Sequence, residues 1–302
     1  MSDNKYTFSS LEHDILRLRR DFPGTEVGTI GTSVWGKPLY YIKIGSGPNE
    51  ISYNGAHHGM ESITSACLMQ FVREFLTAQH DGAPLDGFCT AALAKKTSVY
   101  VVPMLNPDGV QLAAEGLPDG LGKNEREQLI KFCGSKDFSE WQANAHGVDL
   151  NHNYDAMWEK SKAMEAEYGI LSPGPTRFSG SCAESEPESR ALADFTRLHS
   201  FKMVLALHSQ GRVIYHGFCD KEPPYAPEIA RAFTRISPYS LDSTEGIASY
   251  AGYKDWFISC FNRPGFTIEV GEGRNPLPLS DLPQIYRDTL PILLGAMTVA
   301  LP

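Results

Sequence analysis

Short runs of apolar or alternating residues recur along the chain, and turn-forming residues separate them. Such runs are typical of buried strands. We therefore predict strands at PLYYIKIG (38–45), EISYNGA (50–56), SVYVVPMLN (98–106), FKMVLALHS (201–209), RVIYHGF (212–218) and GFTIEVG (265–271).

Longer segments between these runs place apolar residues at helical spacing. They predict helices over residues 10–22, 61–79, 185–199, 226–236 and 282–301. Strands that alternate with helices favour a three-layer α/β/α domain with a mixed, mostly parallel twisted sheet. No internal repeat or linker divides the chain, so we expect a single domain over residues 1–302. Residues 109–145 are long and charged, and residues 171–187 are rich in Pro, Gly and Ser and look irregular. We expect both excursions to build the rim of a site.

Composition and charge narrow the classes of function. The 302 residues are 42% hydrophobic, enough for a sizeable core, and carry a net charge of -9, with no basic cluster longer than RLRR. This balance excludes a nucleic-acid partner. The N-terminus lacks the apolar stretch of a secretory signal, and the apolar C-terminal segment is short for a bilayer. We expect a soluble, cytoplasmic protein with reduced cysteines and no membrane partner; the sequence leaves its oligomeric state open.

Polar side chains follow several predicted strands at the point where each strand ends. Ligands of open α/β sheets collect at the carboxyl ends of the strands. The residues at these ends are His57, His58, Glu61, the NPDG motif at 106–109, His208 and Glu269.

His58 and Glu61 are three residues apart, so their side chains face the same way if the chain turns helically there. Imidazole and carboxylate are both zinc ligands, and a distant third ligand such as His208 leaves a position for water, as in catalytic zinc sites. Taken alone, this pair fits a polar turn with a capping glutamate, and a lone strand-end histidine fits a structural hydrogen bond. The order of all the signals along the chain favours the metal.

That order resembles the zinc carboxypeptidase family, which includes pancreatic carboxypeptidases A and B. The resemblance covers nearly the whole chain and rests on IGTSVWGKPLYYIKIG, GAHHGME, NPDG, GVDLNHNYD, SEPES, LHSQ, AGYKDW and FTIEVG. It implies the carboxypeptidase fold and one Zn²⁺ per chain, held by His58, Glu61 and His208. It also implies Glu269 as the general base that takes a proton from water and delivers it to the leaving amine. His57 lies outside the motif and is expected to support the ligands or to face solvent.

One position departs from the family pattern around the scissile carbonyl. Where pancreatic enzymes have an arginine that stabilises the oxyanion, this chain has Gln142, which donates a hydrogen bond but no charge. Either Arg212 or Arg274 is a candidate for the missing cation, and either also fits a structural or surface arginine.

Further departures concern the released residue. The Asn-Arg pair that grips a terminal carboxylate appears as Asn151-His152, which removes a bidentate guanidinium unless His152 is protonated and does the same task. The alignment puts Ile247 at the mobile tyrosine of the family. Tyr250 and Tyr253 lie nearby, and the sequence does not choose between them.

Lys254 aligns with the base of the S1' pocket, where it either asks for a side chain that ends in a carboxylate or reaches out to solvent. These departures resemble the bacterial γ-D-glutamyl-L-diamino acid endopeptidases. That branch releases meso-diaminopimelate from peptidoglycan peptides, so the resemblance implies a small muropeptide substrate. Two alternatives stay open: a metallocarboxypeptidase that removes C-terminal acidic residues, and a non-catalytic muropeptide-binding protein.

Overall fold

A mixed eight-stranded sheet forms the centre of the computed structural model, which describes residues 5–299 and 301. In sheet order the strands are β1 (Glu26–Thr32), β2 (Pro38–Ile44), β6 (Thr97–Val102), β3 (Asn49–Gly55), β7 (Met203–His208), β10 (Gly265–Glu269), β8 (Val213–His216) and β9 (Ser240–Asp242). The central pairs β6–β3, β3–β7 and β7–β10 are parallel. The predicted sheet is therefore confirmed, whereas the edge strands β1 and β9 were not predicted. A separate hairpin joins β4 (Pro84–Leu85) and β5 (Phe88–Cys89).

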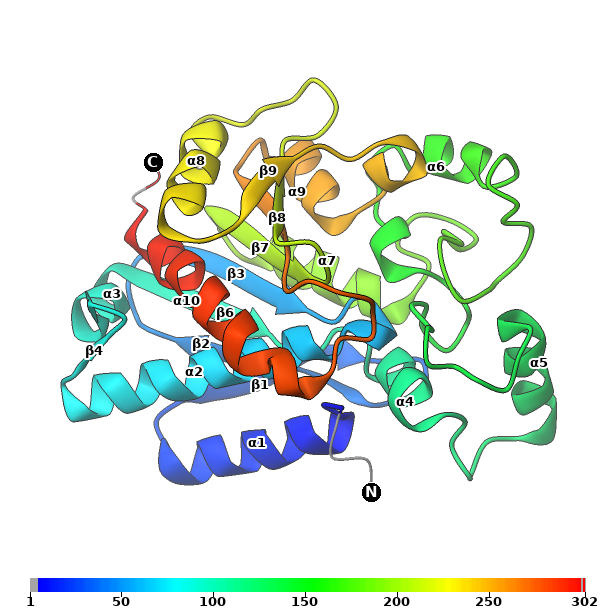
Figure 1. Cartoon of the computed structure of the whole chain (residues 1–302), viewed down its shortest axis with the longest axis horizontal. Helices are drawn as coiled ribbons and strands as arrows, with labels where there is room; N and C mark the ends of the chain where they lie inside the picture. The colour runs from blue at the N-terminus through cyan, green and yellow to red at the C-terminus, as the bar shows by residue number, and fades with distance from the viewer. Residues whose placement is uncertain (1–4, 300, 302) are drawn as a thin grey trace.

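Helices cover both faces of this sheet (Figure 1). One face packs against α1 (Phe8–Asp21), α2 (Ile63–Asp81), α3 (Thr90–Lys96), α8 (Ala226–Ile236) and α10 (Leu282–Thr298). The other face packs against α7 (Pro187–Leu198) and α9 (Tyr253–Phe261). The remaining helices and 3₁₀ turns are η1 (Gly59–Glu61), α4 (Pro107–Glu115), α5 (Lys123–Cys133), η2 (Leu150–His152), α6 (Trp158–Met164), η3 (Gly246–Ser249) and η4 (Leu279–Asp281).

Strand β7 shows why a central strand can be apolar along almost its whole length. Met203, Leu205 and Leu207 belong to the hydrophobic core on the α2 and α10 face. Val204 and Ala206 point the other way, into the core on the α7 and α9 face. Because both faces are covered, every position of the strand is buried and apolar until it reaches His208.

The two predicted excursions differ in structure. Residues 109–145, expected as a long and charged segment, contain most of α4 and all of α5. A small core of their own, which includes Leu112, Leu129, Phe138 and Trp141, holds these helices together. Helix α5 buries only Leu129 among its own residues, so its sequence carries little apolar periodicity. The stretch from 171 to 186 has neither helix nor strand, as predicted.

The strand register brings the candidate residues to one edge of the sheet. Gly55 of β3 pairs with Leu207 of β7, and His208 pairs with Glu269 of β10. Three neighbouring strands therefore end together, and the residues that follow β3 come close to the last residues of β7 and β10. Among the described helices, none is long and apolar enough to cross a membrane.

Candidate metal centre

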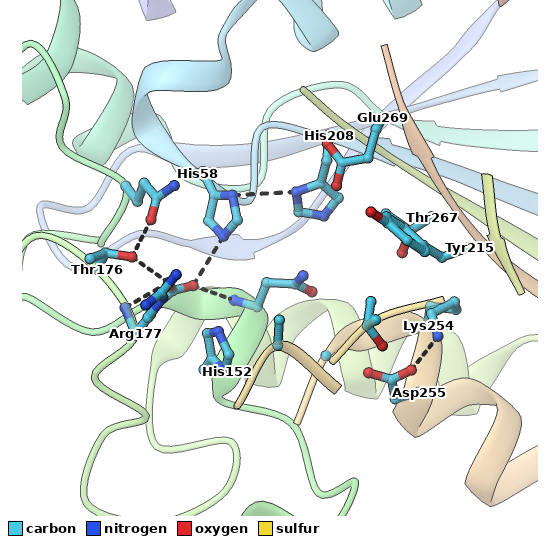
Figure 2. A pocket seen from close by; sticks show the side chains of 16 residues that line it. His58, His152, Thr176, Arg177, His208, Tyr215, Lys254, Asp255, Thr267 and Glu269 are labelled. Carbon is cyan, nitrogen blue, oxygen red and sulfur yellow. Dashed lines mark hydrogen bonds and ion pairs between the residues drawn. The ribbon is translucent and has the colours of Figure 1, made fainter. Parts of the chain in front are cut away.

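Three side chains converge at this edge of the sheet. His58 directly precedes the turn η1, Glu61 ends it, and His208 ends β7. The Nδ1 atom of His58 lies 2.8 Å from Oε1 of Glu61, and Nδ1 of His208 lies 3.1 Å from Oε2 of the same carboxylate. The two Nδ1 atoms are 3.4 Å apart (Figure 2). Within the described residues this is the only group of three or more such side chains with metal-ligand spacing.

The surroundings of these side chains fit a zinc site. Two imidazole nitrogens and one carboxylate form a donor set that zinc accepts. The outer nitrogen of His58, Nε2, lies 3.1 Å from Oδ1 of Asp149, the carboxylate contact that commonly orients a metal-binding histidine. His208 stacks on buried His57, with ring centroids 5.3 Å apart. Both histidine rings are thus held so that Nδ1 faces the shared carboxylate.

The NPDG motif holds the ligand turn in place. Asn106 donates from Nδ2 to the carbonyl oxygen of His57, over 2.9 Å, and its Oδ1 accepts from the backbone of Gly109. Gly59, between the two turn ligands, donates to the carbonyl oxygen of Gln142. A Cβ atom on Gly59 would overlap the backbone of Gly109. The close approach of η1 and α4 therefore requires glycine there.

Glu269 stands beside the ligands without belonging to their group. It ends β10, and its carboxylate lines the same cavity as His58 and His208 (Figure 2). Burial, followed by the nearby charge of Glu61, raises the pKa of the Glu269 carboxyl. A raised pKa makes the carboxylate a better proton acceptor near neutral pH. The role of general base stays a prediction that this position suits.

A cavity of about 360 Å³ extends from the candidate metal ligands to the start of α9. Its lining includes His58, Gln142, Asp149, Asn151, His152, Thr176, Arg177, His208, Tyr215, Lys254, Asp255 and Glu269. Its volume and polar walls suit a small charged molecule.

Lys254 lies buried at the far end of this cavity. Its ammonium donates to the carbonyl oxygen of Gly217 over 2.7 Å and forms an ion pair with Asp255 (Figure 2). The structure thus contradicts the alternative in which Lys254 reaches out to solvent. Sequence analysis missed Asp255, although it directly follows the aligned lysine. The two residues present opposite charges to the same end of the cavity.

Asn151 and His152 line the cavity wall next to α9. Oδ1 of Asn151 accepts from the backbone of Tyr253 over 3.1 Å, so its Nδ2 donor remains for a ligand. His152 is buried, and burial lowers its pKa, which favours the neutral ring. The lowered pKa argues against the prediction that a protonated His152 replaces the family arginine.

Arg177 lines the same cavity and was not found from the sequence. It sits in the left-handed region at a φ of 63°, and its backbone N–H donates to Oδ2 of Asp149 over 2.8 Å. Its only sequence signal is a positive charge in the Pro/Gly/Ser-rich stretch that was expected to form a rim. No fixed spacing ties such a residue to a motif.

The arginine candidates from the sequence lie elsewhere. Arg212 forms ion pairs with Asp288 and Glu272, over 3.3 and 3.4 Å. Arg274 is exposed and ion-paired with Glu140. Neither of them lines the metal cavity in the described part of the chain. Arg274 does line a neighbouring cavity of about 800 Å³, which shares Gln142 and Thr176 with it.

Gln142 lines the metal cavity as predicted, and its Oε1 accepts a hydrogen bond from the Thr176 hydroxyl. Its amide nitrogen, Nε2, is the donor that remains for a substrate oxygen. The interaction with Thr176 fixes which way the amide points. A neutral donor therefore stands where the family has a cation.

The tyrosines near the metal cavity differ in burial and in surroundings. Tyr253 is fully buried, and its hydroxyl lies 2.9 Å from that of Thr196, so it belongs to the core. Ile247 is also buried. Tyr250 lines a smaller cavity that shares Lys254 and Asp255 with the metal cavity. Tyr250 is thus the candidate that stays a prediction.

Comparisons with known proteins agree with this site. A sequence profile described as zinc carboxypeptidase matches residues 12–292. Gamma-D-glutamyl-L-diamino acid endopeptidase 1 of Lysinibacillus sphaericus is 40% identical over 97% of this chain and 72% of its own length. An uncharacterized protein of Bacillus subtilis (strain 168), YqgT, is 33% identical over 97% of this chain and 77% of its own.

A solved structure of thrombin activatable fibrinolysis inhibitor shares the fold, with a TM-score of 0.74 and 19% identity over 97% of this chain and 74% of its own. The sequence profile and the ligand geometry agree on a zinc site that His58, Glu61 and His208 would form. The chain belongs to the zinc carboxypeptidase family and is a zinc metallopeptidase.

Proposed function

We propose that this peptidase hydrolyses the bond between γ-D-glutamate and meso-diaminopimelate in small peptidoglycan-derived peptides. The observation that carries the proposal is the buried Lys254–Asp255 pair at the end of the cavity. The name of the relative that is 40% identical, a gamma-D-glutamyl-L-diamino acid endopeptidase, supports the same substrate class.

The charge pair distinguishes between candidate side chains. The diaminopimelate side chain ends in both a carboxylate and an ammonium group, which suit Lys254 and Asp255 respectively. A glutamate side chain offers only the carboxylate and would also meet the negative charge of Asp255. A lysine side chain offers only the ammonium and would also meet the positive charge of Lys254. A zwitterion is therefore the best match for a buried pair of opposite charges.

Each residue of the cavity has its own role in the proposed reaction. When bound, zinc supplies a Lewis acid that polarises the scissile carbonyl and lowers the pKa of water. Glu269 takes the proton of the attacking water and passes it to the departing amine of diaminopimelate. Gln142 offers its amide donor to the carbonyl oxygen, and Asn151 offers Nδ2 to the released residue. The products are a shorter peptide that ends in D-glutamate and a free diamino acid.

The proposal includes a cytoplasmic role in the turnover or recycling of wall peptides. All six cysteines are free in the structure, and Cys89, Cys182, Cys219 and Cys260 are exposed. Exposed free thiols are typical of a reducing compartment. A cavity of this small size also suits short soluble peptides better than cross-linked wall.

A direct test uses the zinc-loaded protein and two peptides. One is L-Ala-γ-D-Glu-meso-diaminopimelate, and the other is an α-linked peptide that ends in glutamate. We expect free diaminopimelate from the first and little glutamate from the second. Release of glutamate alone would instead establish a carboxypeptidase for acidic residues. Binding of the first peptide without any cleavage would identify a muropeptide-binding protein.

A further inference from the structure

The cavity contains two cations besides its histidines, and they differ in their partners. Lys254 is ion-paired with Asp255 and also donates to a backbone carbonyl. Arg177 has no carboxylate within ion-pair distance among residues 5–299 and 301, and its nearest aromatic partner, Tyr168, lies 5.9 Å from the guanidinium carbon. Its side chain is exposed to the cavity. Arg177 is thus the cation that is free to meet an anionic ligand.

One buried carboxylate fixes Arg177 relative to the metal ligands. Oδ1 of Asp149 lies 3.1 Å from Nε2 of His58 and accepts from the backbone of Asn151, also over 3.1 Å. Oδ2 of Asp149 accepts from the backbone of Arg177. This contact holds Arg177 in the left-handed conformation, which few arginines adopt. The same carboxylate therefore positions a metal ligand, an amide donor and a guanidinium around one cavity.

The geometry points to Arg177 as the residue that binds the α-carboxylate of the released diamino acid, together with the Nδ2 donor of Asn151. The inference rests on the proposed function in taking the diamino acid as the residue released. A guanidinium matches a carboxylate with two parallel hydrogen bonds, which a histidine ring does not offer. Lys254 and Asp255 then remain for the distal end of the same residue. A loop arginine would thus replace the arginine that this chain lacks at position 152.

The test compares the tripeptide with its analogue in which only the diaminopimelate α-carboxylate is converted to a carboxamide. Arg177→Gln should lower kcat/KM for the acid by about ten- to a hundredfold, mainly through KM, which is the scale of one charge-assisted pair. The kcat/KM for the carboxamide analogue should fall only a few-fold. The preference of the wild-type protein for the acid should therefore collapse in the variant. Arg177→Lys should restore part of it, because a charge remains without the two-pronged geometry.

Two other results would overturn the inference. An equal loss with both substrates, carried by kcat, would place Arg177 at the carbonyl oxygen in the transition state instead. An unchanged kcat/KM for the acid would remove Arg177 from substrate binding altogether. Zinc content and the thermal unfolding midpoint of each variant show whether the fold and the metal site are intact. Arg235→Gln, on the exposed side of α8, is the matched control for loss of one positive charge.

Failure of the proposed function can be told apart from failure of this inference. If the wild-type protein releases no diaminopimelate but cleaves another peptide, the proposed function is wrong. The acid and amide forms of that other peptide then test Arg177 in the same way. Calorimetric titration with free diaminopimelate adds a readout without turnover. We expect Arg177→Gln to weaken this binding by about tenfold or more, and equal affinity in both proteins would contradict the assignment.

Discussion

The proposed role of Glu269 as general base depends on its buried position beside charged neighbours. It ends β10 beside the metal ligands, and burial raises its pKa. Glu269→Gln keeps the shape of the side chain but removes its ability to accept a proton. We expect the variant to retain zinc and near-native substrate affinity while kcat falls by roughly 10²-fold or more. Elemental analysis and steady-state kinetics check both parts, and a variant within a few-fold of wild type would assign the base elsewhere.

Lys254 is the residue on which the expected specificity depends. It is ion-paired with Asp255, and we propose that it provides the positive charge for the distal carboxylate of diaminopimelate, which lysine lacks. Lys254→Met keeps much of the length and removes this charge, and it also leaves Asp255 without its partner. We expect the ratio of kcat/KM for the diaminopimelate tripeptide over the lysine tripeptide to fall by about ten- to a hundredfold. An unchanged ratio in the same assay would show that another residue recognises the distal carboxylate.

The turn η1 depends on how closely its backbone approaches α4. A Cβ on Gly59 would overlap the backbone of Gly109, so Gly59→Ala must push the turn away from that helix. His58 directly precedes this turn and Glu61 ends it, so both ligands would move with it. We expect zinc affinity to fall by about tenfold or more, the scale seen when supports of metal ligands are lost. Competition with a chromogenic chelator measures the affinity.

Gly120→Ala is the matched control for this change. Gly120 has no heavy atom within 4 Å of the position that a Cβ would take, so its substitution should leave zinc affinity unchanged. Native affinity in Gly59→Ala would mean that the turn adjusts without moving its ligands.

The sequence predicted the elements whose pattern is local. The central strands β3, β6, β7 and β10 are apolar or alternating runs, and each was expected near its observed position. Helix α9 was missed because its first six residues, 253–258, are all buried, polar and apolar alike, so its sequence shows no helical period of apolar positions. Strand β1 was missed because it contains two glycines and is only partly buried.

The same reasoning explains which parts of the site were found. His58, Glu61, His208 and Glu269 lie at or just after strand ends, where position along the chain predicts proximity in space. Arg177 lies in a loop without regular structure, and its place in the cavity depends on a backbone contact with Asp149. That contact joins residues far apart in the sequence and has no local signature.

At the scale of the whole molecule, the buried carboxyl of Glu188 connects helix α7 to the loops around the site. Glu188 accepts hydrogen bonds from the backbone of Val34 over 3.1 Å and from Asn144 over 3.0 Å. Burial raises its pKa from 4.5 to about 7, Asn144 opposes this rise, and the nearby charge of Asp108 adds to it. The folded protein therefore binds a proton here that the unfolded chain has already released between pH 4.5 and about 7.

This proton makes stability depend on pH. The stabilisation from Glu188 is fully present below about pH 4.5 and is lost as the pH rises through about 7, a change of up to about 3 kcal/mol. Glu188→Gln should remove this part of the pH dependence. Urea unfolding of both proteins at pH 5 and pH 8 measures it, and any constant cost of the substitution cancels in the difference between the two pH values. Equal pH dependence in both proteins would show that Glu188 titrates as in an unfolded chain.

We propose that zinc, the diamino acid and both charge-binding groups share one cavity. A crystal structure of the protein with zinc and meso-diaminopimelate tests this most directly. We expect zinc bound by His58, Glu61 and His208, the α-carboxylate of the diamino acid at Arg177, and its distal end at Lys254. Zinc bound by other residues, or the diamino acid bound outside this cavity, would contradict it.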